Sequence, residues 1–201
     1  MVLPHSNKTI TYAEYLTWTD ERYCEALNGE IISMAPAPSP RHQDVVGGVY
    51  AAFRAHLKGA TSKPFIAPID VCLFAESNTP EQNIKDWVQP DLIIVCNPHI
   101  IGDKRIIGCP DFIAEVTSPS TFKNDRVRKF QAYAQAGVKE YWIIDPYHEF
   151  VETFILRGTV LERSGQYFLG DSVPCSLFSG FRLDLTELFG PAAQTEQLPE
   201  A

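Results

Sequence analysis

Apolar and polar positions recur along the chain with two different periods, which separate expected helices from expected strands. Val45, Val49 and Phe53 follow helical spacing, and Thr11 with Glu14 forms a capping box at the start of a shorter helix. The cluster Ser118-Pro-Ser-Thr starts a third helix, which Gly137 ends. The pattern predicts helices over residues 12–18, 40–58, 118–137 and 185–189.

Shorter apolar runs between these helices predict strands. Asn28-Gly29 supplies two residues that tolerate positive φ, which indicates a hairpin turn between two of the runs. Residues 87–97 and 111–118 are almost continuously apolar, as is typical of strands buried on both faces. The expected strands are 23–27, 30–34, 64–74 with a bend at Pro68, 87–97, 111–118, 138–145, 150–157, 159–165 and 166–169.

This order of elements predicts an α/β (α+β) fold, with a mixed central sheet flanked by helices and extended by β-hairpins. With 201 residues and 45% hydrophobic residues, the chain can bury the core of one domain. We expect that domain to span residues 1–190, and we expect residues 191–201 to form a disordered tail because they have little to bury.

Composition narrows the function classes. No apolar run approaches the roughly 18–20 residues of a membrane span, and the first residues do not resemble a secretory signal. The five cysteines are widely spaced and form no CxxC pair, which favours buried thiols in a reducing compartment over disulfides or a zinc cage. We therefore expect a cytoplasmic protein without a membrane partner.

The net charge of −8 argues mildly against a protein that binds nucleic acid tightly and without specificity. It does not exclude a nuclease, whose active site needs acidic residues and whose positive charge can be local. The segment 123–139 holds five Lys and Arg residues within about one helix length. These cations could contact a substrate or form a solvated helix face, and the sequence leaves both readings open.

Two carboxylates lie inside the apolar central strands: Asp91 in the first and Glu115 in the second. A buried charge is costly unless it is compensated. If the two strands are neighbours, the carboxylates meet at one end of the sheet, and both stay ionised only beside a cation. Oxygen ligands of this kind suit Mg²⁺ or Mn²⁺. The alternatives are that Asp91 caps a strand-end turn and that Glu115 pairs with a Lys or Arg.

A lysine could complete the site from the helix that follows. Asp125, Lys129 and Tyr133 recur at i, i+4 and i+8, on one face of an α-helix, so Lys129 can reach the sheet from its flank. An ammonium there could orient the attacking water or neutralise charge on a phosphate. The alternative is a simple salt bridge between Lys129 and Asp125.

Five stretches together resemble the Uma-type endonuclease family, part of the PD-(D/E)XK superfamily. They are Glu25–Ile31, Ser39–Gln43, Pro90-Asp91, Glu115-Val116-Thr117 with the helix that carries Asp125 and Lys129, and Gly137–Pro146. The resemblance extends from about Tyr12 to Leu188 and implies a restriction-endonuclease-like fold with a metal-dependent phosphodiesterase site.

The resemblance also implies roles for individual residues. Asp91 and Glu115 would bind the metal, the backbone carbonyl of Val116 would add a ligand, and Glu25 would be a further acidic residue. The superfamily's lysine normally follows the Glu by two positions, where this chain has Thr117. Lys129 on the following helix is the natural substitute, and Arg126 and Arg128 are the alternatives.

Two further residues complete the candidate set. His42 lies at a helix N-terminus, where the helix dipole favours the neutral imidazole, and it could contact a phosphate or a metal-bound water, or simply cap or pack. Glu30 lies across the Asn-Gly turn from Glu25, and we expect only one of these two to face the site.

These observations favour a Mg²⁺-dependent endonuclease that hydrolyses DNA with metal-activated water. The alternative is a catalytically inactive domain that keeps the nuclease fold as a binding or assembly module. A metal-dependent hydrolase of another phosphate ester would share the same site. Because both strands of a duplex must be cut, we also expect a homodimer.

Overall fold

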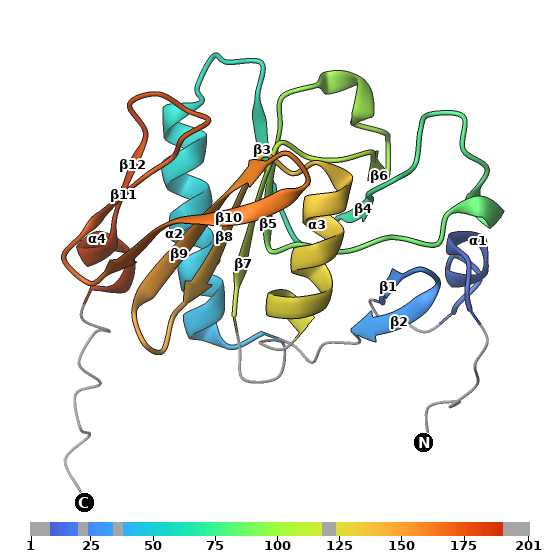
Figure 1. Ribbon diagram of the computed structural model, residues 1–201, viewed down its shortest axis with the longest axis horizontal. Coiled ribbons are helices and arrows are strands. Elements are labelled where there is room, and N and C mark those ends of the chain that lie inside the picture. Colours follow the sequence, from blue (N-terminus) through green and yellow to red (C-terminus); the bar gives the residue numbers. More distant parts are fainter. Residues whose placement is uncertain (1–8, 20–23, 34–37, 118–123, 191–201) are drawn as a thin grey trace, which may run out of the picture.

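A computed structural model describes residues 9–19, 24–33, 38–117 and 124–190. Its centre is a six-stranded sheet with the order β10-β9-β8-β7-β5-β3 (Figure 1). Strands β7 and β8 are parallel and every other neighbouring pair is antiparallel, so the predicted mixed sheet is confirmed. The strands are β3 (Lys63–Ile66), β5 (Leu92–Val95), β7 (Phe112–Val116), β8 (Glu140–Asp145), β9 (Phe150–Arg157) and β10 (Val160–Phe168).

Helices cover both faces of this sheet. Helix α2 (Pro40–His56) buries Val45, Val49 and Phe53 against one face, together with the short hairpin of β11 (Ser172–Pro174) and β12 (Arg182–Asp184) and helix α4 (Leu185–Phe189). Helix α3 (Phe130–Ala136) packs against the other face. Because side chains alternate along a strand, even-numbered positions of β7 face α2 and odd-numbered positions face α3.

A separate hairpin lies beside the sheet, formed by β1 (Glu25–Leu27) and β2 (Glu30–Ser33). Its turn has positive φ at Asn28 and Gly29, as the sequence predicts for an Asn-Gly hairpin. Helix α1 (Tyr12–Tyr15) has the expected capping box, but it ends three residues before the predicted boundary at Trp18. The hairpin brings Glu25 toward the end of the central sheet.

The predicted strand over residues 64–74 is wrong in its extent. It divides at Pro68 into β3, which belongs to the central sheet, and β4 (Asp70–Cys72), which pairs in parallel with β6 (Arg105–Ile107). A proline offers no N–H to a sheet ladder, so the chain leaves the sheet there and starts a second one. Two short 3₁₀ turns, Glu81–Asn83 and Pro98–Ile100, lie in the connections on this side.

The C-terminal hairpin also differs from its prediction. The expected strands 159–165 and 166–169 form one strand, β10, with an irregularity between Arg163 and Gly165. The third predicted helix begins, within the described residues, as π-helical turns over Asn124–Lys129 and continues as α3. Its predicted start at 118–121 and the tail 191–201 lie outside the described residues. Among the described helices, none is long and apolar enough to cross a membrane.

Candidate active site

The register between β5 and β7 sets the spacing of the two embedded carboxylates. These strands are antiparallel with Leu92 opposite Ala114, so the next residues outward, Asp91 and Glu115, face each other at the end of the pair. The amide of Val116 donates to Asp91 Oδ2 at 2.8 Å, and the amide of Asp91 lies 3.4 Å from Glu115 Oε2. Each carboxylate therefore lies close to a backbone amide of the opposite segment. The prediction that the two strands are neighbours is confirmed.

Glu115 lies on the face of β7 that α3 covers, and one side chain from that helix and one from the π-helical turns before it reach Glu115. Lys129 Nζ lies 3.0 Å from Glu115 Oε1, and the Tyr133 hydroxyl donates to the same oxygen at 2.6 Å. Lys129 and Glu115 are only 5% and 3% exposed. Burial first, and then the nearby carboxylates, raise the pKa of Tyr133 well above its ordinary value, so it remains a neutral donor.

The hairpin contributes a third carboxylate. Glu25 Oε1 lies 2.8 Å from Lys129 Nζ and accepts a hydrogen bond of 2.8 Å from the amide of Gln89. The exposed Glu30 does not pair with Lys129 but with Arg128, whose Nη2 lies 2.6 Å from Glu30 Oε2. As expected, only one of the two hairpin glutamates faces the site. Lys129 thus joins the hairpin to the central sheet by bridging two buried carboxylates.

His42 lies at the third position of α2, which begins at Pro40. The helix is capped by Ser39, whose hydroxyl accepts from the His42 amide at 3.2 Å. The His42 imidazole instead approaches the strand end, with Nε2 3.3 Å from Asp91 Oδ2. Among the described residues, no Lys or Arg lies within ion-pair distance of Asp91. The His42 side chain therefore lies beside the candidate carboxylates, and the cap of the helix is formed by Ser39.

Thr117 does not contact the carboxylates. Thr117 is buried, and both its amide and its hydroxyl donate to the carbonyl of Ile144 on β8, at 2.8 and 3.3 Å. Thr117, where the resemblance leads us to expect a lysine, therefore holds two strands together here. The side chain of Asp125 falls outside the described part of the structure, so its proposed pairing with Lys129 stays a prediction.

Sequence reasoning missed a set of residues that holds Glu25 in place. Gln89 donates through its amide to Glu25 and through Nε2 to Asp70 Oδ1 at 2.7 Å. Asp70 in turn accepts from the hydroxyl of Tyr12 at 2.5 Å. A signal for Asp70 was present, because it is also a carboxylate in a short apolar strand, the same feature that singled out Glu115.

The donor chemistry of this cluster fits a hard divalent cation. Mg²⁺ is commonly held by one or two carboxylates, with water and substrate phosphates supplying the remaining oxygens. Within the described residues, no group of three or more His, Cys, Asp or Glu side chains is placed to hold a metal by itself. Asp91 and Glu115 provide two carboxylates, and one oxygen of Glu115 is already bonded to Lys129 and Tyr133.

Comparisons with known proteins agree with this fold. A crystal structure from Anabaena variabilis, described as "a putative nuclease belonging to DUF820", superposes with a TM-score of 0.69 at 19% identity, and the match covers 90% of this chain and 97% of that one. An uncharacterized protein of Synechocystis, slr1290, is 28% identical in an alignment of 149 residues that covers 68% of this chain and 72% of the relative. The family model for Uma2, described as "Putative restriction endonuclease", matches residues 12–186. The chain therefore belongs to the Uma2 family, and its architecture is that of a DUF820 nuclease structure.

Proposed function

We propose that this protein is an endonuclease that hydrolyses DNA with the help of Mg²⁺ or Mn²⁺. One observation carries the proposal: Lys129, from a flanking helix, reaches Glu115 at the same sheet end where Asp91 faces it. This arrangement supplies the cation that Thr117 cannot supply from the strand. Membership of the Uma2 family supports a nucleic acid as the substrate.

In this proposal, Asp91, Glu115 and the carbonyl of Val116 hold the ion. A bound divalent cation lowers the pKa of a coordinated water and stabilises charge on a phosphate. Asp91 suits this role because its charge has no Lys or Arg partner among the described side chains. The Val116 amide fixes the rotamer of Asp91 by donating to Oδ2, which leaves the other oxygen to approach a ligand.

Lys129 is assigned to the phosphate. Its ammonium would orient the attacking water or offset charge on the phosphate oxygens as the bond to the leaving oxygen breaks. Glu25 and Tyr133 would keep Lys129 in position. Glu25 pairs with the Lys129 ammonium, and Tyr133 donates a hydrogen bond to Glu115, the other carboxylate that Lys129 contacts. His42 would donate a hydrogen bond through Nε2 to a phosphate oxygen or to a water beside Asp91.

Plasmid cleavage tests the proposal. The wild-type protein should nick or linearise supercoiled DNA with Mg²⁺ or Mn²⁺ and not with EDTA, and Asp91→Ala should abolish the reaction. Asp103→Ala makes the same chemical change on an exposed loop and should cleave as the wild type does. Cleavage that persists in Asp91→Ala, or no cleavage by the wild type under any of these conditions, would refute it.

A second candidate, an inactive binding or assembly module, is favoured by one feature. The strand position of the superfamily's lysine is occupied by Thr117, which is used in strand pairing. Calorimetry with Mn²⁺ separates the candidates, because the nuclease must bind Mn²⁺ through Asp91 and the module need not. A hydrolase of another phosphate ester would bind Mn²⁺ in the same way and fail only on DNA.

We also propose that the active species is a homodimer, because one site cuts one strand at a time. Sedimentation velocity on the purified protein tests this directly. A monomer at concentrations where double-strand cleavage occurs would rule it out.

A further inference from the structure

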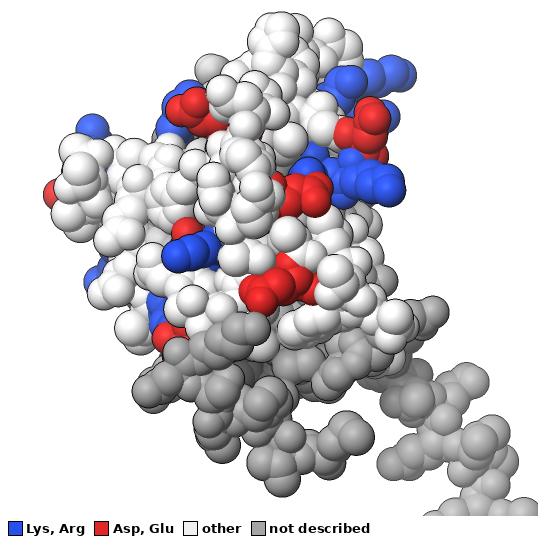
Figure 2. Space-filling model, turned by 90° about the vertical axis from the view of Figure 1, so that its right-hand side faces the viewer, with Lys and Arg blue, Asp and Glu red and all other residues white. Residues whose placement is uncertain are grey.

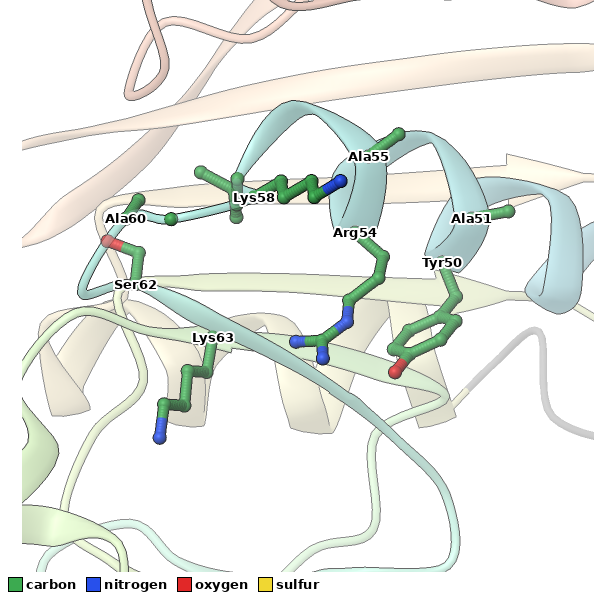
Figure 3. A pocket seen from close by; sticks show the side chains of 10 residues that line it. Tyr50, Ala51, Arg54, Ala55, Lys58, Ala60, Ser62 and Lys63 are labelled. Carbon is green, nitrogen blue, oxygen red and sulfur yellow. The ribbon is translucent and has the colours of Figure 1, made fainter.

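A basic pocket opens at the edge of the sheet, away from the carboxylates. It is formed by the C-terminal part of α2, the connection after it and the start of β3, and its volume is about 610 Å³. Tyr50 and Arg54 point from the helix toward the strand that carries Lys63, and Lys58 extends back along the helix (Figure 3). We call this opening the edge pocket. Its polar side chains come from Tyr50, Arg54, Lys58, Ser62 and Lys63.

The charges of the edge pocket are of one sign and uncompensated. Arg54, Lys58 and Lys63 are exposed, and no described residue forms an ion pair or hydrogen bond with their side chains. No Asp or Glu lines the opening. Elsewhere among the described residues, several cations have carboxylate partners, for example Arg105 with Glu81. Three unpaired cations around one opening give a local excess of positive charge on a chain with net charge −8.

The shape of the edge pocket suits a polymer backbone. Apart from Tyr50 and the buried Leu57, the uncharged lining consists of small residues, among them Ala51, Ala55, Gly59 and Ala60, so a ligand can approach the helix closely. The volume is more than a single inorganic ion needs. On the face shown in Figure 2, by contrast, red and blue side chains are interspersed, and no continuous basic track is visible there.

Helix α2 connects the edge pocket to the candidate active site. His42, near the start of the helix, lies beside Asp91, whereas Arg54 lies twelve residues farther along. At about 1.5 Å per residue this is roughly 18 Å, or about five phosphates along one DNA strand at about 3.4 Å each. Strand pairing also places the edge pocket away from the carboxylates, because Lys63 pairs with Val95, which lies four residues beyond Asp91 along the chain.

We propose that the edge pocket binds the sugar-phosphate backbone of duplex DNA several nucleotides away from the bond that is cut. Resting on the proposed nuclease function, this assigns Arg54, Lys58 and Lys63 to phosphate contacts and Tyr50 to a hydrogen bond through its hydroxyl. The contacts are independent of sequence and position the duplex. They also give an acidic chain three cations at one place for contact with DNA.

Fluorescence anisotropy with a labelled 30-base-pair duplex, in EDTA so that no cleavage occurs, tests the proposal. The variant Arg54→Ala/Lys58→Ala/Lys63→Ala should bind at least about tenfold more weakly, and its plot of log K against log salt should be shallower by about 2–3 units. The matched control is Lys85→Ala/Lys104→Ala/Arg157→Ala, which removes three exposed cations elsewhere and changes the net charge equally. It should bind within about twofold of the wild type.

Equal losses in the two triple variants, or no loss in either, would overturn the proposal. An edge-pocket variant that changes oligomeric state in sedimentation velocity but keeps its DNA affinity would also overturn it, and would identify the edge as a contact between copies. Plasmid cleavage by the wild type is measured in parallel. If cleavage is present but the edge-pocket variant binds normally, only this inference fails; if binding is lost as expected but no cleavage occurs, only the nuclease proposal fails.

Discussion

Replacing Lys129 by Met should destabilise the protein strongly, even though methionine fits a buried position. The ammonium lies 2.8 Å from Glu25 and 3.0 Å from Glu115, and all three residues are less than 10% exposed. Removing one partner of a buried ion pair costs about 3–5 kcal/mol, because the remaining charge is left buried without compensation. For a chain of this size that corresponds to a fall in Tm of roughly 6–20 °C.

The matched control is Lys139→Met. Lys139 Nζ lies 2.6 Å from Asp111, closer than either contact of Lys129, but its side chain is 60% exposed. Exposed pairs contribute about 0–1 kcal/mol, so this variant should be close to the wild type. The comparison therefore separates burial from distance as the source of the effect.

Urea unfolding monitored by circular dichroism, with EDTA and then with Mn²⁺, measures both variants. In EDTA, Lys129→Met should lose several times more free energy of unfolding than Lys139→Met. Added Mn²⁺ should stabilise Lys129→Met more than the wild type, because a cation can then take the place of the ammonium between two carboxylates. If the two variants differ by less than about 1 kcal/mol in EDTA, the reasoning about the buried bridge is wrong.

Three further predictions follow from local contacts. Tyr133→Phe removes the 2.6 Å hydrogen bond to Glu115 and should cost about 1.5–3 kcal/mol in urea unfolding; a loss below about 0.5 kcal/mol would mean that another donor replaces it. Gly29→Ala places a Cβ 2.8 Å from a backbone oxygen at φ +74°, whereas Gly158→Ala at φ +63° meets open space, so the first should be less stable by about 1–3 kcal/mol, and equal stabilities would contradict this. Burial acts to raise the pKa of Asp145, but hydrogen bonds from a histidine ring and two backbone amides outweigh it and lower the pKa. The stability that Asp145 contributes is thus complete above its unfolded pKa of about 3.9 and is lost as the pH falls further, so Asp145→Asn should be less stable than the wild type near neutral pH and should approach it in acid, as unfolding at several pH values would show.

The positions of the candidate residues relative to one another were largely predictable, because patterns that can be read in a sequence constrain them. A carboxylate inside an apolar strand needs compensation, and this singled out Asp91 and Glu115 without knowledge of the pairing. Helical spacing then placed Lys129 within reach of the sheet. The spacing holds only in part, since the chain is π-helical up to Lys129 and α-helical from there to Tyr133. That stretch still brings both side chains to one oxygen of Glu115.

Contacts between distant segments were not predictable in the same way. The run 64–74 appears as one strand because both halves are apolar, and only pairing partners reveal that Asp70 belongs to a different sheet from Lys63. The network from Tyr12 through Asp70 to Gln89 joins segments that are 58 and 19 residues apart in the sequence. No local pattern encodes such a contact, because it depends on how the hairpin and the second sheet pack.

Positive charge shows the same distinction. The predicted basic cluster over 123–139 is dense in sequence, yet its described members Arg128, Lys129 and Lys139 each pair with carboxylates. Arg54 and Lys63 belong to different elements and form no cluster in the sequence, but they line one opening. Density along the chain is therefore a poor guide to free positive charge, because a helix distributes neighbouring residues over all its faces.

The antiparallel register of β5 and β7 has a consequence for how the site can vary among related chains. Asp91 and Glu115 are opposed because of strand pairing, and the length of the connection between the strands does not enter. Insertions or deletions in residues 96–111 can therefore change the surface while the two carboxylates keep their spacing. A single residue added within β5 or β7 would instead turn one carboxylate to the opposite face of the sheet, where α2 packs. Strand pairing therefore fixes the distance between the two carboxylates, and the loops around the sheet can differ in length without changing it.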